Sequence, residues 1–204
     1  MIATRPQLQA SLLSIVAGMA DAVGYIAMGG VFAANMTGNT VLAGLALGEG
    51  QFETAARRMA PLLTFFLGAM LARLLVRLIH RPAVPLLIEA ALLAVVDFLP
   101  LGRESALLLV ALAMGLQASA ITHFGGTALS TVVVTSTLAR IAETTLDRLW
   151  PTGRPLPSVA TPRLLALTWI GYLAGAMTGV LLIHILPWPL LVPAVLLVTV
   201  VTTL

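Results

Sequence analysis

The segment 18-GMADAVGYIAMGGVFAANMTGNT-40 interrupts a chain whose sequence is otherwise close to hydrocarbon in character. It places one aspartate, two asparagines, two threonines and the pair Gly29-Gly30 between two apolar runs. A carboxylate in the middle of a bilayer costs roughly 2.5–3.5 kcal/mol on insertion scales, so it needs a reason to be there. A Gly-Gly pair breaks a helical pattern and lets backbone approach backbone or a ligand closely. The segment therefore indicates either a polar site within a membrane or a place of tight helix packing.

The composition predicts an integral membrane protein. Of the 204 residues, 59% are hydrophobic and 9% are charged, and the mean hydropathy is +1.04, whereas soluble domains carry about 25% charged residues. The basic residues are all arginines and are thinly spread, so the net charge of +3 does not indicate a nucleic-acid partner. The chain has no cysteine, and its three scattered histidines lack metal-ligand spacing, so we expect no metal and no cofactor.

Apolar runs predict an all-α integral membrane protein with a single transmembrane domain, because a crossing helix needs about 20 residues. The helical bundle is predicted to have six long spans, at 8–28, 59–79, 86–99, 105–122, 162–186 and 190–204. Two shorter helices, at 31–47 and 127–142, each follow a Gly-Gly pair. The polar stretch 143–161 is predicted to be a loop outside the membrane.

The two halves of the chain, about 8–99 and 104–204, predict an internal repeat. The matching features are Gly29-Gly30 with Gly125-Gly126, Thr37-Gly38-Asn39 with Thr135-Ser136-Thr137, and Leu67-Gly68-Ala69-Met70 with Ala174-Gly175-Ala176-Met177. Glycine-broken short segments at corresponding positions point to the central site of a transporter. Chance similarity between two halves rich in Gly, Ala and Leu is the alternative.

The topology has two solutions. If the short helices cross the membrane the repeats are parallel, and if they are re-entrant the repeats are inverted. The arginines divide eight against three between the two sides in both cases, which predicts cytoplasmic N- and C-termini. The segment 31–47 is nearly long enough to cross a membrane, which slightly favours eight crossing segments.

The first-half residues Ala17 to Gly24, Gly29 to Phe32 and Asn35 to Asn39 resemble the signature of the YoaK-like bacterial membrane family, a domain of unknown function. Gly115-Leu116-Gln117 and Thr135-Ser136-Thr137-Leu138 resemble its second block, although Ser136 stands where that family tends to have glycine and Ala118 where it tends to have asparagine. The resemblance spans nearly the whole chain. It implies a permease-like protein of the bacterial inner (plasma) membrane and implies no particular substrate.

Asp21 is the sharpest candidate for a functional residue. On a helix it shares a face with Gly18 and Tyr25, and the glycine would let another helix approach the carboxylate. We expect Asp21 to face the protein interior, near Glu89 or the segment 35–39, and to bind substrate and carry a proton. Glu89, within a predicted span, is a second candidate for proton coupling. The alternative is an aspartate that is hydrogen-bonded only for helix packing.

The remaining candidate substrate-binding residues follow the glycine pairs or occupy the position equivalent to Asp21. They are Asn35, Thr37, Asn39, Gln117, Thr135 and Thr137. Short helices that begin within the protein would direct free N–H groups and a positive dipole end at a polar ligand. Ordinary helix capping by Asn and Thr is the competing explanation.

These features predict a small secondary transporter for a small polar or anionic solute, with proton coupling as an option. The alternative is a non-transporting membrane scaffold or partner subunit whose polar residues only hold helices together. We find no catalytic grouping and therefore expect no enzyme. The expected partners are the lipid bilayer and an unidentified small molecule, and a homodimer through the small-residue face Gly171, Gly175 and Gly179 stays open beside packing within the chain.

Overall fold

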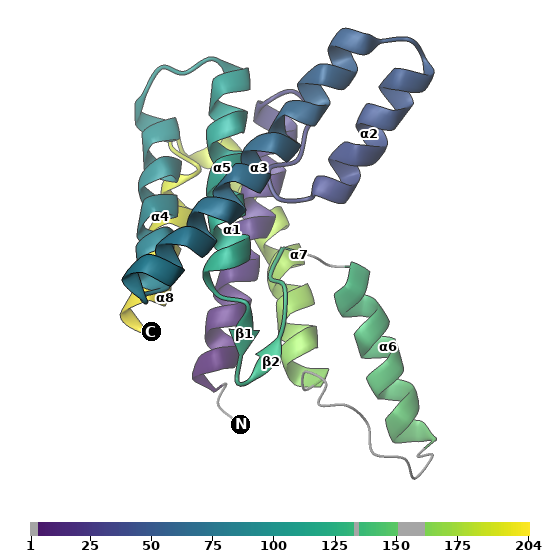
Figure 1. Ribbon diagram of the computed structural model, residues 1–204, viewed down its shortest axis with the longest axis vertical. Helices are drawn as coiled ribbons and strands as arrows, with labels where there is room; N and C mark the ends of the chain where they lie inside the picture. The colour runs from purple at the N-terminus through teal and green to yellow at the C-terminus, as the bar shows by residue number, and fades with distance from the viewer. Residues whose placement is uncertain (1–3, 133–134, 151–161) are drawn as a thin grey trace.

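The computed structural model describes residues 4–132, 135–150 and 162–204. Within these ranges the chain is almost entirely helical, with one short β-hairpin (Figure 1). The first half contains α1 (Arg5–Ala27), α2 (Met36–Gly48), α3 (Phe52–Ile79) and α4 (Ala83–Phe98). The second half contains α5 (Arg103–Ala120), β1 (His123–Phe124), β2 (Thr127–Ala128), α6 (Thr135–Leu149), α7 (Pro162–Ile185) and α8 (Leu191–Thr202).

The helices confirm the all-α membrane character of the chain. In the described ranges, three helices, α1, α3 and α7, are long and apolar enough to cross a bilayer. Helices α4, α5 and α8 have 16, 18 and 12 residues. At about 1.5 Å per residue, α4 and α8 are shorter than the roughly 30 Å of a hydrocarbon core.

Both short helices start later than the sequence pattern indicates. The predicted segment 31–47 is helical only from Met36, because Gly29 and Gly30 adopt φ values of +97° and +72° and the chain then runs on without helix to Asn35. The predicted segment 127–142 is wrong at both ends. Its first residues form β2, which pairs with β1 around Gly125-Gly126, and α6 continues to Leu149. The predicted loop 143–161 is therefore helical over its first seven residues, and 151–161 lie outside the described residues.

The path of the chain shows how α2 is placed (Figure 1). Helix α1 rises from the N-terminus to the opposite end of the molecule, where α3 begins its return. Between them the chain drops to mid-height, and α2 runs back to the end that α1 had reached. Helices α1 and α5 run in opposite directions, as do α2 and α6.

Helices from the two halves pack closely on one another. Helix α1 lies along α7, and α3 lies along α5. A Cβ atom added to Gly175 would overlap the carbonyl oxygen of Ile15, and one added to Gly68 would overlap that of Leu112. Glycine at these places lets the helix backbones touch. The predicted small-residue face is confirmed as a contact within the chain, because Gly171 and Gly179 also meet the α1 backbone.

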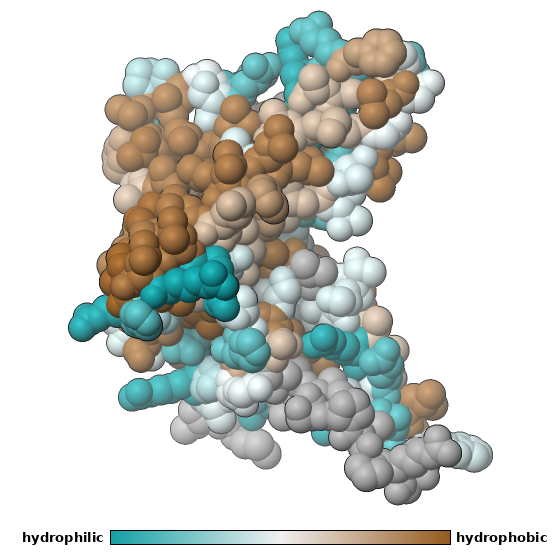
Figure 2. All heavy atoms as spheres, in the orientation of Figure 1, coloured by the Kyte–Doolittle hydropathy of each residue, from teal (hydrophilic) through white to brown (hydrophobic). Residues whose placement is uncertain are grey.

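The core lies where α1, α4, α5, α7 and α8 converge. Its largest fully buried side chains include Leu13, Leu86, Met114, Leu165 and Leu197. Helix α3 is largely exposed along its apolar length, and Figure 2 shows a continuous hydrophobic surface over it. Such a surface fits contact with lipid, since soluble proteins rarely expose apolar patches of this extent.

Candidate functional site

Asp21 holds the start of α2 in place. Its side chain is 3% exposed, and its Oδ1 accepts hydrogen bonds from the backbone N–H groups of Ala34 at 2.6 Å and Asn35 at 3.1 Å. The hydroxyl of Tyr172 on α7 donates to Oδ2. Asp21 thus faces the interior beside the segment 35–39, as expected. Three donors therefore satisfy both oxygens of this buried carboxyl group.

Asn35 and Asn39 both stabilise the local fold around α2. Asn35 is the N-cap, and its Oδ1 accepts from the N–H of Gly38 at 3.0 Å. Asn39 is fully buried, and its amide bonds both backbone groups of Phe32, with Phe32 N–H donating at 2.9 Å and Nδ2 donating to the carbonyl at 2.7 Å. Asn35 also lines a cavity of about 430 Å³, and Asn39 is not among the residues that line it.

Asn39→Ala is expected to lower the free energy of unfolding by about 1–3 kcal/mol, because both Phe32 backbone groups lose their partner. The measurement is the thermal unfolding midpoint of the purified protein in detergent. Thr40→Ala is the matched control on the next residue, since the Thr40 hydroxyl is exposed and bonds only to the Met36 carbonyl in its own helix. Equal midpoints for the two variants would contradict this structural role of Asn39.

The central cavity lies between the first turns of α2 and α6 and has a volume of about 430 Å³. Its walls carry Asn35 and Thr37 from α2, Thr135 from α6, Phe65 from α3 and Tyr172 from α7. The structure therefore brings together three of the predicted binding residues at the facing ends of the two short helices. In Figure 2 the surface is hollowed between α2 above and α6 below.

The other predicted residues lie away from this cavity. Gln117 is fully buried and donates to the Leu13 carbonyl at 3.0 Å and to the Thr131 hydroxyl at 3.2 Å, so it ties α5 to α1 and to the segment before α6. Thr137 lines a separate, smaller cavity. Glu89 is fully buried on α4, and neither carboxyl oxygen has a hydrogen-bond partner among the described residues.

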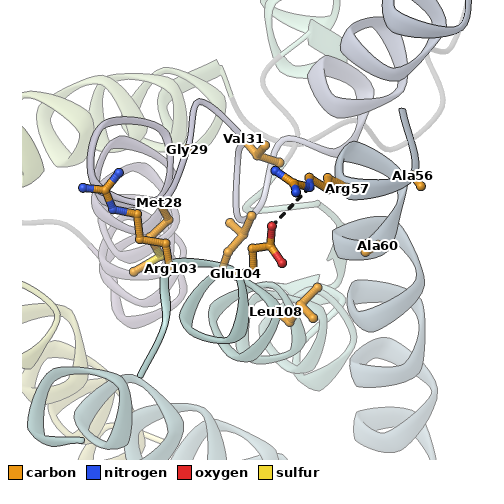
Figure 3. Close-up of a pocket in the computed structure, with 10 residues that line it drawn as sticks. Met28, Gly29, Val31, Ala56, Arg57, Ala60, Arg103, Glu104 and Leu108 are labelled. Atoms are coloured by element: carbon orange, nitrogen blue, oxygen red, sulfur yellow. Dashed lines mark ion pairs between the residues drawn. The ribbon is translucent and has the colours of Figure 1, made fainter. Parts of the chain in front are cut away.

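A second cavity, of about 480 Å³, lies beside the Gly29-Gly30 turn (Figure 3). Arg57 Nε is 3.3 Å from Glu104 Oε1 there, and Arg57 Nη2 is 2.7 Å from Glu53 Oε1. These side chains are mostly exposed, and exposed ion pairs contribute about 0–1 kcal/mol. Arg57 is shared between two carboxylates, and Arg103 also lines this cavity.

Sequence reasoning missed the two aromatic walls of the central cavity, Phe65 and Tyr172. Both lie in apolar helices, where an aromatic residue does not stand out as a candidate for a ligand site. The signal that identifies them is the matched pair Gly68 and Gly175, because Phe65 and Tyr172 each precede their glycine by three residues. Tyr172 also lines an apolar groove of about 390 Å³ with Asp21, so its ring separates this groove from the central cavity.

No cluster of three potential metal-ligating His, Cys, Asp or Glu side chains occurs among residues 4–132, 135–150 and 162–204. The cavity residues that can act on a ligand are therefore hydroxyls, an amide and backbone N–H groups. Such groups can donate hydrogen bonds to a polar molecule or accept them from one.

Comparison with known proteins agrees with this architecture. The family described as "Protein of unknown function (DUF1275)" matches residues 9–203. The UPF0700 transmembrane protein YoaK of Bacillus subtilis (strain 168) is 34% identical over 178 residues, which cover 82% of this chain and 79% of that protein. No solved structure matches the chain significantly. The chain therefore belongs to the DUF1275 family and is a YoaK-like transmembrane protein.

Proposed function

We propose that this protein is a small secondary transporter whose substrate site is the central cavity. The observation that supports the proposal is the meeting of the α2 and α6 first turns at one cavity of about 430 Å³. Transporters typically bind substrate between the repeats, at the N-termini of discontinuous helices. The volume lies within the range of small-molecule sites.

The cavity favours a small polar solute that is neutral or is taken up as an anion together with a proton. Thr37 and Thr135 offer hydroxyls, and Asn35 offers its amide N–H groups. Among the described residues no arginine lines the cavity, so a bare anion would find only dipoles and hydroxyls there. The carboxyl group of Asp21 accepts a hydrogen bond from Tyr172, which lines the cavity, and Asp21 is the candidate proton carrier of the site. Glu89 is the second candidate, because its carboxyl is buried without a partner among the described residues.

Two inverted repeats, 8–99 and 104–204, form the architectural part of the proposal, with six spans and two re-entrant helices. Support comes from the helix contacts: Gly18 meets the Tyr172 carbonyl as Gly115 meets that of Phe65. The arginines of this arrangement lie mainly at the end that holds both termini, which makes that end cytoplasmic by the positive-inside rule.

The alternative function is a scaffold or partner subunit. The polar interactions of Gln117 and Asn39 suit that function equally well, because Gln117 joins α5 to α1 and Asn39 holds the loop before α2. The central cavity distinguishes the two, since a transporter must admit water and solute there and a scaffold need not.

Single-cysteine labelling tests whether water reaches the cavity, and the natural chain has no cysteine to interfere. Thr37→Cys and Thr135→Cys are expected to react with a charged methanethiosulfonate reagent in membranes at least tenfold faster than Met70→Cys. Met70 is 55% exposed on α3 but faces lipid in this proposal, where its thiol would meet little water. The measurement is the rate of labelling, read by the mass of the purified protein.

Leu197→Cys is the buried control, because Leu197 is fully enclosed in the core. All four variants are then labelled in denaturant to show that each thiol is intact. Slow labelling of both threonine positions, equal to that of Leu197→Cys, would favour the scaffold and end the transport proposal.

A further inference from the structure

A third cavity, of about 260 Å³, lies between the C-terminal end of α5, the β-hairpin with the residues that follow it, and the first turns of α6. It is lined by Thr122, Ser130, Ser136, Thr137 and Arg140 together with three apolar residues. Ser136 follows Thr135 directly, so this polar cavity adjoins the central one along α6.

Arg140 supplies a positive charge, and most of its N–H donors have no partner among the described residues. Its Nη1 donates to the Ala128 carbonyl at 3.1 Å, which orients the guanidinium against the hairpin. A guanidinium has five N–H donors, and the described residues provide Arg140 with no ion pair. The carboxylates of α6, Glu143 and Asp147, lie one and two turns further along the helix and do not line the cavity.

Two serine hydroxyls complete the set of donors. Ser130 is half-buried and Ser136 is exposed, and neither side chain makes a hydrogen bond within the described ranges. Arginine binds oxyanions in planar, charge-assisted pairs, and neighbouring hydroxyls donate to the remaining oxygens. A volume of about 260 Å³ accommodates a phosphate-sized or short carboxylate group.

We infer that Arg140, Ser130 and Ser136 form a binding site for an oxyanion, distinct from the central cavity. A role of this site in holding an anionic solute before transport rests on the proposed transport function. Its binding chemistry does not, and the anionic group it binds belongs either to a free solute or to the headgroup of an acidic lipid.

Binding of inorganic phosphate to the full-length protein tests the site. The protein is placed in nanodiscs of phosphatidylcholine at low salt, and titration calorimetry measures the dissociation constant. We expect saturable binding that weakens at least tenfold in Arg140→Gln and severalfold in Ser136→Ala. Arg148→Gln, which removes the same charge two turns further along α6, is expected to leave the constant unchanged. Arg140→Lys keeps the charge and tests the site if Arg140→Gln fails to fold.

A second arm separates the two sources of the anion. Nanodiscs containing phosphatidylglycerol, without free phosphate, are compared for the number of lipids retained by the wild type and by Arg140→Gln. Binding of free phosphate identifies a solute site, and Arg140-dependent retention of phosphatidylglycerol without phosphate binding identifies a headgroup site. The inference is overturned if neither ligand binds, or if Arg148→Gln weakens binding as much as Arg140→Gln. Failure of the cysteine labelling described above would remove the transport proposal and leave this result unaffected.

Discussion

Asp21→Ala is expected to destabilise the protein strongly and to release the start of α2. The substitution removes the acceptor for the N–H groups of Ala34 and Asn35 and leaves the Tyr172 hydroxyl unpaired. Each buried donor left without a partner costs about 1–3 kcal/mol. The thermal unfolding midpoint in detergent measures the loss, and the labelling rate of Asn35→Cys reports the local opening.

Asp21→Asn is the informative comparison. Its Oδ1 can still accept from both backbone N–H groups, and its Nδ2 can donate to the Tyr172 oxygen, so most of the stability should return. This variant cannot carry a proton, so it separates the structural role of Asp21 from the proposed proton coupling. Tyr172→Phe, combined with Asp21→Ala in a double-mutant cycle, isolates the Asp21–Tyr172 hydrogen bond between α1 and α7. An Asp21→Ala midpoint equal to that of the wild type would show that the carboxylate does not hold α2.

Gly175→Leu is expected to separate α7 from α1. Even a methyl group there would overlap the Ile15 carbonyl oxygen, and the Cα of Ile15 would lie 2.8 Å from it. Overpacking a close contact usually costs about 1–3 kcal/mol and occasionally more, and a backbone carbonyl cannot rotate away. Loss of the monodisperse peak in size-exclusion chromatography after stepwise heating measures the effect.

Gly44→Ala is the control for Gly175→Leu, because nothing lies within 4 Å of the added Cβ on α2. Alanine is favoured over glycine within a helix by about 0.8–1 kcal/mol, so this variant should unfold at the same temperature as the wild type or higher. Gly68→Leu should reproduce the loss on the α3–α5 side. Normal behaviour of Gly175→Leu would show that the α1–α7 contact is looser than the structure indicates.

Local features of the sequence were sufficient to predict part of the site. Asp21 and Asn35 are close in the chain, and the Gly29-Gly30 turn between them leaves few other partners for a buried carboxylate. The close contacts of Gly171, Gly175 and Gly179 also follow from their spacing, because residues four apart share a helix face.

Features that depend on long-range contacts could not be predicted in the same way. The late start of α6 follows from the β1–β2 pairing, and two-residue strands leave no periodic signal. The structural roles of Asn39 and Gln117 depend on the backbone groups they reach, Phe32 and Leu13, and residue type alone does not distinguish a ligand donor from a packing bond. Tyr172 was missed because its partner, Asp21, lies 151 positions away.

The packing of helices from one half on helices from the other limits how the molecule can change shape. Helix α1 packs on α7, and α3 packs on α5, through backbone contacts. Because each half is held to the other at these two places, the halves cannot move apart as rigid bodies. Among the helices of the described ranges, α2 packs only on α3 and α6 only on α7. Elements with few packed neighbours open at the lowest free energy. In the proposed transporter, alternating exposure of the cavity would therefore come from movement of these two short helices relative to a fixed frame of α1, α3, α5 and α7. Amide hydrogens should exchange faster in α2 and α6 than in α1 and α5.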